Sequence, residues 1–400
     1  MMKGSNFLIF SSLSLVIFPS QLSLYDSSWV ILPAIGLISF VLIAFSIIIV
    51  SENLSFYLNV KCSVLFILLI IASFLSYMTT GSPRPIMVYG SLISLFIVTS
   101  NLAIRVNNVN EVVITIIFGA CLTALLIYIL GINEKFSFYR YKGFFTNSNS
   151  MGSFSANIIH MIIGIIYIFR KEISRTKKYL LYFILILSVI FLLASNSRAA
   201  LLSVIFVLMF ILFNEISKSF QISKFKVNVF YFKNFLKLFI FLTILLFSIY
   251  SYGLLDNVID KFYSQERLSL TNFTDTRFEG WLFAIENWKW FGNGPLNDLG
   301  YNYRKVLTGH STWISHLNKY GLIASSLFIF GILAMFKFAW TQVKINNSKI
   351  GLIFILIFLG YIVNASFETV TSTPGMMISL IIFSILFSNT KFPNSKNILK

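Results

Sequence analysis

Residues 179–214 read YLLYFILILSVIFLLASNSRAALLSVIFVLMFILFN, and this stretch determines the kind of fold that the chain can adopt. It holds two apolar runs, 179–195 and 198–214, separated only by Asn196 and Ser197, and its one charged residue is Arg198. About 20 apolar residues are enough to cross the hydrocarbon core of a bilayer as a helix. We therefore expect two membrane-spanning helices here, with Arg198 at a membrane surface.

The same pattern recurs along the whole chain of 400 residues, of which 57% are hydrophobic and 11% charged, with a mean hydropathy of +0.83. A soluble domain carries about 25% charged residues, so this composition excludes a soluble, disordered or fibrous protein. In hydrocarbon the backbone must pair its own polar groups, and each run is therefore expected to be a helix. The predicted fold is an all-α polytopic membrane protein with about twelve transmembrane helices, near 7–23, 28–50, 60–79, 85–103, 112–131, 151–169, 179–195, 198–214, 234–253, 320–340, 349–366 and 374–389.

The charges predict the orientation of these helices. If both termini lie in the cytoplasm, nineteen of the 31 lysines and arginines lie on the cytoplasmic side, with the tightest cluster at 170–178. Cytoplasmic loops are enriched in Lys and Arg, which favours this orientation and explains the net charge of +17 without a nucleic-acid partner. Cys62 and Cys121 lie in apolar runs without metal-ligand spacing and are expected to be buried thiols.

One predicted extracytoplasmic segment, Leu254–Asn318, is long and rich in tryptophan. A long segment of this kind is usually functional, and its aromatic content is typical of a folded unit resting on the membrane interface. The chain therefore divides into residues 1–253 with nine spans, an extracytoplasmic catalytic loop at 254–318, and residues 319–400 with three spans.

This loop is predicted to contain two short amphipathic helices. In the first, Asp275 is the expected N-cap and Arg277 lies in the first turn, where a helix N-terminus and an arginine together can hold an anion. The apolar face of this helix is formed by Phe278, Trp281, Leu282, Ile285 and Trp288, and Gly292, Gly294 and Pro295 end it. A surface ion pair of Arg277 with Asp275 or Glu279 is the alternative.

The second helix has Trp313, Ile314, Leu317 and Tyr320 on one face and ends before Gly321. His310 precedes it and is the candidate general base, since a histidine titrates near neutral pH. A capping or interfacial role is the alternative for His310. His316, inside the helix, is expected to be structural, and His160, in the middle of a span, is expected to be a neutral histidine bonded to a neighbouring helix.

Three more ionisable residues are expected on the same side of the membrane. Arg198 would hold a positive charge at the rim of a cavity, with snorkelling as the alternative, and Arg140 precedes a polar stretch that enters a span. Glu368 could be an acidic partner of the arginines or the histidine. The sequence has no metal-binding or nucleotide-binding motif, so no metal or cofactor is expected. Arginines that hold an anion, together with a general base, suit an anionic activated substrate such as a lipid pyrophosphate.

Four stretches carry a resemblance to a known family: Arg140-x-x-Gly143-Phe144 with Asn147-x-Asn149-x-x-Gly152; Ser197-Arg198-Ala199; Asp275-x-Arg277-x-x-x-Trp281 with Gly292-x-Gly294; and His310-Ser311 with Leu317-x-x-Tyr320-Gly321-Leu322. In their order, spacing and sidedness they resemble the O-antigen ligase and polymerase superfamily of bacterial cell-envelope glycosyltransferases. The resemblance spans most of the chain and is strongest from Arg140 to Gly321.

The resemblance implies a site at the outer face of the bacterial inner membrane and a metal-independent, inverting transfer of a glycan from undecaprenyl pyrophosphate. Carried over by position, His310 would activate the acceptor hydroxyl, and Arg198 and Arg277 would hold the pyrophosphate, with Arg140 as a further member. A ligase would attach O-antigen to lipid A-core during lipopolysaccharide biosynthesis. A polymerase would extend a lipid-linked O-antigen or capsular chain. Ser311 stands where ligases of enteric bacteria often have asparagine, which weakens the assignment to a ligase over a polymerase. Both remain open, and a polysaccharide flippase is the alternative from another class.

Overall fold

The computed structural model describes residues 60–104, 108–131, 136, 140–143, 145, 147–221, 281, 285–293, 311–367 and 374–391. The predicted spans 7–23, 28–50 and 234–253 and most of the 254–318 segment lie outside these residues. Within them, the regular elements are helices: α4 (Val60–Thr80), α5 (Arg84–Ile104), α6 (Val109–Gly131), α7 (Ser148–Phe169), α8 (Arg175–Ser195), α9 (Arg198–Gln221), α14 (Thr312–Asn346), α15 (Lys349–Phe367) and α16 (Pro374–Lys391).

Each predicted apolar run that falls in the described residues coincides with one of these helices. Seven of them are long and apolar enough to cross a membrane, and α5 and α16 contain shorter apolar stretches at Val88–Asn101 and Ile378–Thr390. The all-helical, membrane-type architecture is therefore confirmed for this part of the chain. The total of about twelve spans stays a prediction.

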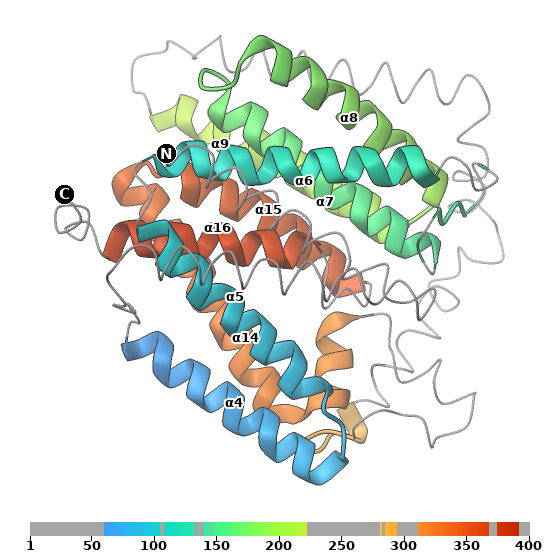
Figure 1. Ribbon diagram of the computed structural model, residues 1–400, viewed down its shortest axis with the longest axis vertical. Coiled ribbons are helices and arrows are strands. Elements are labelled where there is room, and N and C mark those ends of the chain that lie inside the picture. Colours follow the sequence, from blue (N-terminus) through green and yellow to red (C-terminus); the bar gives the residue numbers. More distant parts are fainter. Residues whose placement is uncertain are drawn as a thin grey trace.

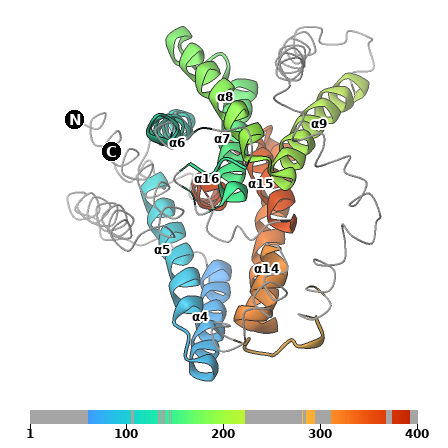
Figure 2. The ribbon, with the colours of Figure 1, turned by 90° about the vertical axis from the view of Figure 1, so that its right-hand side faces the viewer.

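The described helices form two packed groups that share α15 and α16 (Figures 1 and 2). On one side α7 packs against α6, α8, α9 and α15, and on the other α5 packs against α4 and α16 while α14 packs against α4 and α15. Helix α7 is the centre of its group, since it packs against all four of the other helices there and most of its side chains are buried. The exposed aliphatic side chains of α4 are those expected of a helix facing lipid.

The turns between the helices explain the sharp boundaries that the sequence predicts. Asn147 caps α7 by accepting a hydrogen bond from the Ser150 N–H at 2.8 Å. Asn196, the C-cap of α8, adopts the left-handed conformation (φ 56°), and its N–H donates to the Leu193 carbonyl at 3.0 Å. Asparagine tolerates this conformation better than most residues, so only Asn196 and Ser197 separate the end of α8 from the start of α9.

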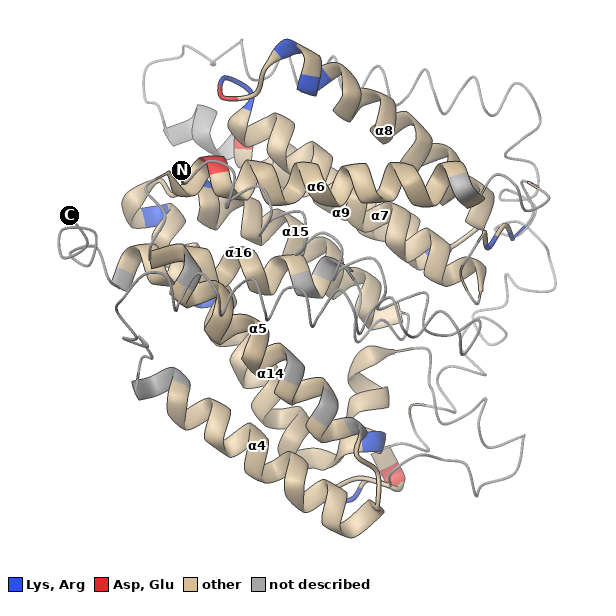
Figure 3. Ribbon diagram, in the orientation of Figure 1, with Lys and Arg blue, Asp and Glu red and all other residues tan. Residues whose placement is uncertain are grey.

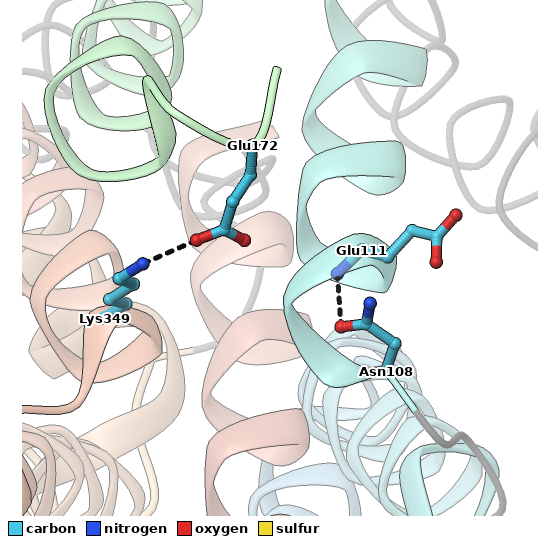
Figure 4. Close-up of polar contacts among 4 residues, drawn as sticks. All are labelled: Asn108, Glu111, Glu172 and Lys349. Atoms are coloured by element: carbon cyan, nitrogen blue, oxygen red, sulfur yellow. Dashed lines mark hydrogen bonds and ion pairs between the residues drawn. The ribbon is translucent and has the colours of Figure 1, made fainter. Parts of the chain in front are cut away.

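Charged residues lie at the two ends of the bundle and are sparse between them (Figure 3). One end, here called the basic end, holds the α7–α8 loop and the start of α15. Lys349 at the start of α15 forms an ion pair with Glu172 in this loop, with a Nζ–Oε1 distance of 2.5 Å (Figure 4). The α7–α8 loop and the α14–α15 turn therefore share one end, as the predicted orientation requires. Which end faces the cytoplasm stays a prediction.

Candidate functional site

The Arg198 region is a compact turn at the end of the bundle opposite the basic end. Arg198 is the first residue of α9 and is partly buried, and Ser195, Asn196 and Ser197 before it are buried. The Ser195 hydroxyl donates to the Leu192 carbonyl at 2.6 Å and accepts from the Ser197 N–H at 3.3 Å. This network fixes the backbone from which the Arg198 side chain extends.

The start of α7 packs directly on this turn. A β-carbon on Gly152 would lie 2.4 Å from the Ser197 Cβ and 2.6 Å from the Ser195 Oγ, closer than real side-chain contacts allow. Only glycine permits this approach between the two chain segments. The stretch Asn147–Gly152 and the stretch Ser197–Ala199, which the sequence analysis singled out separately, are therefore neighbours in the fold.

The Arg140 stretch joins the same place. The Tyr141 N–H donates to the Ala194 carbonyl at 2.9 Å, and the Tyr141 ring lies 5.7 Å from Phe191 in α8. Arg140 itself is exposed, in a left-handed turn with φ 52°. Two of the four stretches that carry the family resemblance, Arg140–Gly152 and Ser197–Ala199, thus meet at one end of the bundle, and we call this the site end.

The beginning of α14 and the end of α15 also meet each other. The Trp313 indole N–H donates to the Ser366 hydroxyl at 3.1 Å, and the Trp313 ring lies 6.5 Å from Tyr361. Ser311 is the buried N-cap residue of α14. The predicted base His310 directly precedes Ser311, and the predicted acid Glu368 directly follows the last residue of α15. His310, Glu368 and Arg277 themselves lie outside the described residues.

Helices α7 and α15 are antiparallel, so the start of α14 and the end of α15 lie at the site end. A β-carbon on Gly164 would lie 3.3 Å from the Ile353 side chain, whereas a β-carbon on Gly360 would lie 2.2 Å from the His160 ring. Moving toward the start of α7 therefore means moving toward the end of α15. Arg140 and Arg198 therefore lie at the same end of the bundle as the start of α14, which follows His310, and the end of α15, which precedes Glu368.

A buried polar cluster inside the bundle was missed by the sequence analysis apart from His160. His160 is fully buried, and its Nε2 lies 3.5 Å from the Ser203 hydroxyl of α9, as expected for a neutral histidine bonded to a neighbouring helix. Asn157 and Asn364 are 1% exposed, and neither side-chain atom of Asn157 has a hydrogen-bond partner among the described residues. Ser153, Asn157 and His160 recur at i, i+4 and i+7, a polar stripe visible in the sequence.

The first turns of α14 bury a polar face. The apolar residues Trp313, Ile314 and Leu317 are only partly buried, while the buried positions include Thr312, Ser315, His316 and Asn318. Of the four residues predicted to share one face, only Tyr320 is buried, and lipid makes an outward apolar face favourable for the others. His316 Nδ1 lies 3.0 Å from the Tyr89 hydroxyl of α5, and its ring stacks on Phe328 at 4.8 Å, which fits the predicted structural role.

An apolar groove runs from this histidine–tyrosine pair toward the basic end. It has a volume of about 230 Å³ and lies between α4, α5, α14 and α16. Tyr89 and Phe328 line the part of the groove nearest the site end, and Phe96, Phe338 and Phe387 line the part nearest the basic end. Its lining is aliphatic or aromatic, so it can accommodate a hydrocarbon chain rather than a sugar.

No model of a known protein family matches this chain, and a search of curated proteins also found no match. The described residues contain no group of three or more His, Cys, Asp or Glu side chains that could hold a metal ion.

Proposed function

We propose that this protein is a membrane glycosyltransferase that moves a glycan from undecaprenyl pyrophosphate to an acceptor hydroxyl at the outer face of the bacterial inner membrane. The observation that carries the proposal is the convergence of the Arg140, Gly152 and Arg198 segments at one end of an apolar helical bundle. A resemblance based on short stretches gains weight when stretches far apart in sequence pack together.

The proposed chemistry needs a base and a positive site for the leaving group. His310 takes the proton of the acceptor hydroxyl while its oxygen attacks the anomeric carbon. The bond from that carbon to the pyrophosphate breaks, and undecaprenyl pyrophosphate leaves with the electron pair. Arg198 and Arg277, with Arg140 beside them, stabilise the charge that develops on the pyrophosphate, and Glu368 orients the histidine or an arginine.

The apolar groove supports a lipid-linked substrate. The Tyr89 hydroxyl, which contacts His316, lies at the end of the groove nearest the site end, and the rest of the groove extends along the apolar parts of α4, α5, α14 and α16. A pyrophosphate near the arginines with a polyprenyl tail in the groove matches this arrangement of charge and apolar surface. In hydrocarbon, such a groove is filled by a lipid chain at little cost in desolvation.

Two enzymes of this type differ only in acceptor. A ligase attaches O-antigen to lipid A-core, whereas a polymerase extends an O-antigen or capsular chain on a lipid carrier. The test is deletion of the gene followed by electrophoresis of the surface glycans. Loss of all long chains on lipid A indicates a ligase, and glycans of a single repeat unit indicate a polymerase. An unchanged glycan pattern would contradict both.

A second candidate is a polysaccharide flippase, which the buried polar side chains of Asn157, His160 and Asn364 within the spanning helices favour. Polar side chains away from the membrane surface are typical of transport pathways. The two candidates respond differently to substitution: transport depends on His160 and Asn157, and glycosyl transfer depends on His310 and Arg198. Comparing His160→Ala with His310→Ala in the deletion strain separates them.

A further inference from the structure

The segment before the long helix α14 replaces hydrogen bonds that α14 itself lacks. Helix α14 is broken at Gly321, whose backbone (φ 88°, ψ 170°) is non-helical and accessible essentially only to glycine. A break of this kind frees backbone groups on both sides, and buried backbone groups need partners. In an unbroken helix the Asn318 carbonyl would accept from the Leu322 N–H, and the Lys319 carbonyl from the Ile323 N–H.

Residues 289–293 supply those partners. The Leu322 N–H donates to the Lys289 carbonyl at 3.0 Å and the Ile323 N–H donates to the Trp290 carbonyl at 3.3 Å. In return, the Asn293 N–H donates to the Asn318 carbonyl at 2.8 Å. Three of the four freed groups, on both sides of the break, are therefore paired with one short segment.

Two further contacts tie this segment to α14. The Asn293 amide donates to the Asn318 Oδ1 at 2.6 Å and to the Asn287 carbonyl at 3.1 Å. Gly292, also at φ 88°, lies so close to Gly321 that a β-carbon on either would be within 2.4–2.8 Å of the other segment's backbone. Asn318 is fully buried. We call residues 289–293 together with 318–323 the clamp.

We infer that Asn293 and Asn318 are positioning residues of a clamp that stays closed in the working enzyme. The inference rests on the proposed function, in which residues on either side of the clamp bind the pyrophosphate and activate the acceptor. The segment 294–310 is preceded by Asn293 of the clamp and followed by Ser311, the N-cap residue of α14, so both of its ends are joined to residues tied to α14. Opening the clamp would leave the freed groups of α14 unpaired, which favours a fixed rather than a moving attachment.

The experiment places cysteines at both positions, Asn293→Cys and Asn318→Cys, in a Cys62→Ala, Cys121→Ala background. Two residues joined by both a backbone and a side-chain hydrogen bond are close enough for a disulfide, whose Cα atoms lie about 4.4–6.8 Å apart. The protein is reconstituted in nanodiscs, and kcat and KM for a lipid-linked glycan are measured before and after oxidation. The single-cysteine variants and Asn346→Leu, an exposed asparagine at the basic end, are the matched controls.

The reduced double variant and Asn293→Leu should lose about 10- to 100-fold in kcat with little change in KM, because misplacing a reacting group by about 1 Å costs up to that much. Oxidation should restore kcat of the double variant and leave the single variants unchanged. Failure to form the disulfide, or inactivation by oxidation that a reductant reverses, would overturn a closed clamp. Wild-type kcat in Asn293→Leu would overturn the positioning role.

The crosslink separates this inference from the proposed function. If wild-type protein transfers no glycan, the proposed function fails, and the clamp is judged by the disulfide yield and by hydrogen exchange at Asn293, Leu322 and Ile323. Slow exchange at these amides, accelerated by Asn293→Leu, supports the clamp. Exchange as fast as in an unstructured peptide contradicts it.

Discussion

Gly152 in α7 packs directly against Ser197 at the junction of α8 and α9. Because glycine has no side chain, the two segments approach to a distance at which a β-carbon would lie 2.4 Å from the Ser197 Cβ. This contact holds the start of α7 next to Ser197, the residue directly before Arg198. The arrangement of the candidate site thus depends on the absence of one methyl group.

Gly152→Ala should therefore destabilise the protein by about 1–3 kcal/mol, the usual cost of overpacking, and should lower glycan output by displacing Arg198. Thermal unfolding of the detergent-solubilised protein measures the first effect. The matched control is Gly90→Ala in α5, where a β-carbon would meet no atom within 4 Å. If both variants unfold at the wild-type temperature, the contact between α7 and the α8–α9 junction is not as described.

Much of the described architecture was predictable because hydrocarbon forces each long apolar run into a helix. The turn at Asn196 and Ser197 and the break at Gly321 were also readable, since asparagine and glycine accept backbone conformations that other residues avoid. The residues that these positions contact could not be predicted from the sequence. Nothing local in the sequence pairs Gly292 with Gly321, because their contact depends on how two distant segments pack.

The buried polar residues show the same limit. An asparagine at 157 or 364 is visible inside an apolar run, but its burial depends on which helices surround it. For the candidate site, the sequence predicted the residue types and their side of the membrane. The structure adds the meeting of the Arg140, Gly152 and Arg198 segments, while the roles of all the predicted site residues stay predictions: Arg140, Arg198, Arg277, His310 and Glu368.

Arg198→Ala and Arg277→Ala should each remove at least about 2 kcal/mol of transition-state stabilisation, or roughly 30-fold in rate, by deleting a charge-assisted contact to the leaving group. Lysine should restore only part of the activity, since it lacks the two-pronged guanidinium. Steady-state kinetics with a lipid-linked glycan measure this. Normal kcat in a well-inserted Arg277→Ala variant would assign that residue to a surface ion pair instead.

Ala334→Phe should obstruct the apolar groove and raise KM for a polyprenyl-linked donor several-fold, with little change in kcat. Ala334 lines the groove, whereas the neighbouring Leu333 does not and is 62% exposed. Leu333→Phe is therefore the control for added bulk on the same helix. Equal KM values for the two variants would argue that the tail binds elsewhere.

The orientation can be tested with single cysteines in the Cys62→Ala, Cys121→Ala background. Lys142→Cys at the site end, and Ser264→Cys in the long segment, should react with a membrane-impermeant maleimide in cells whose outer membrane is permeable to it. Asn346→Cys at the basic end should react only after the inner membrane is opened, because basic loops remain in the cytoplasm. The reverse pattern would invert the topology and place the candidate site inside the cell.

The central claim is that His310 acts as a base in glycosyl transfer, and its most direct test is transfer by purified protein in nanodiscs. A radiolabelled glycan on undecaprenyl pyrophosphate is supplied with lipid A-core or with a second lipid-linked repeat unit, and product and released undecaprenyl pyrophosphate are quantified without added metal. Wild-type protein should transfer the glycan to one of the two acceptors. His310→Ala should be slower by about 10²–10⁴-fold, while His316→Ala and His160→Ala, if folded, retain most activity. Full transfer by His310→Ala, or no transfer by wild type to either acceptor, would contradict the account.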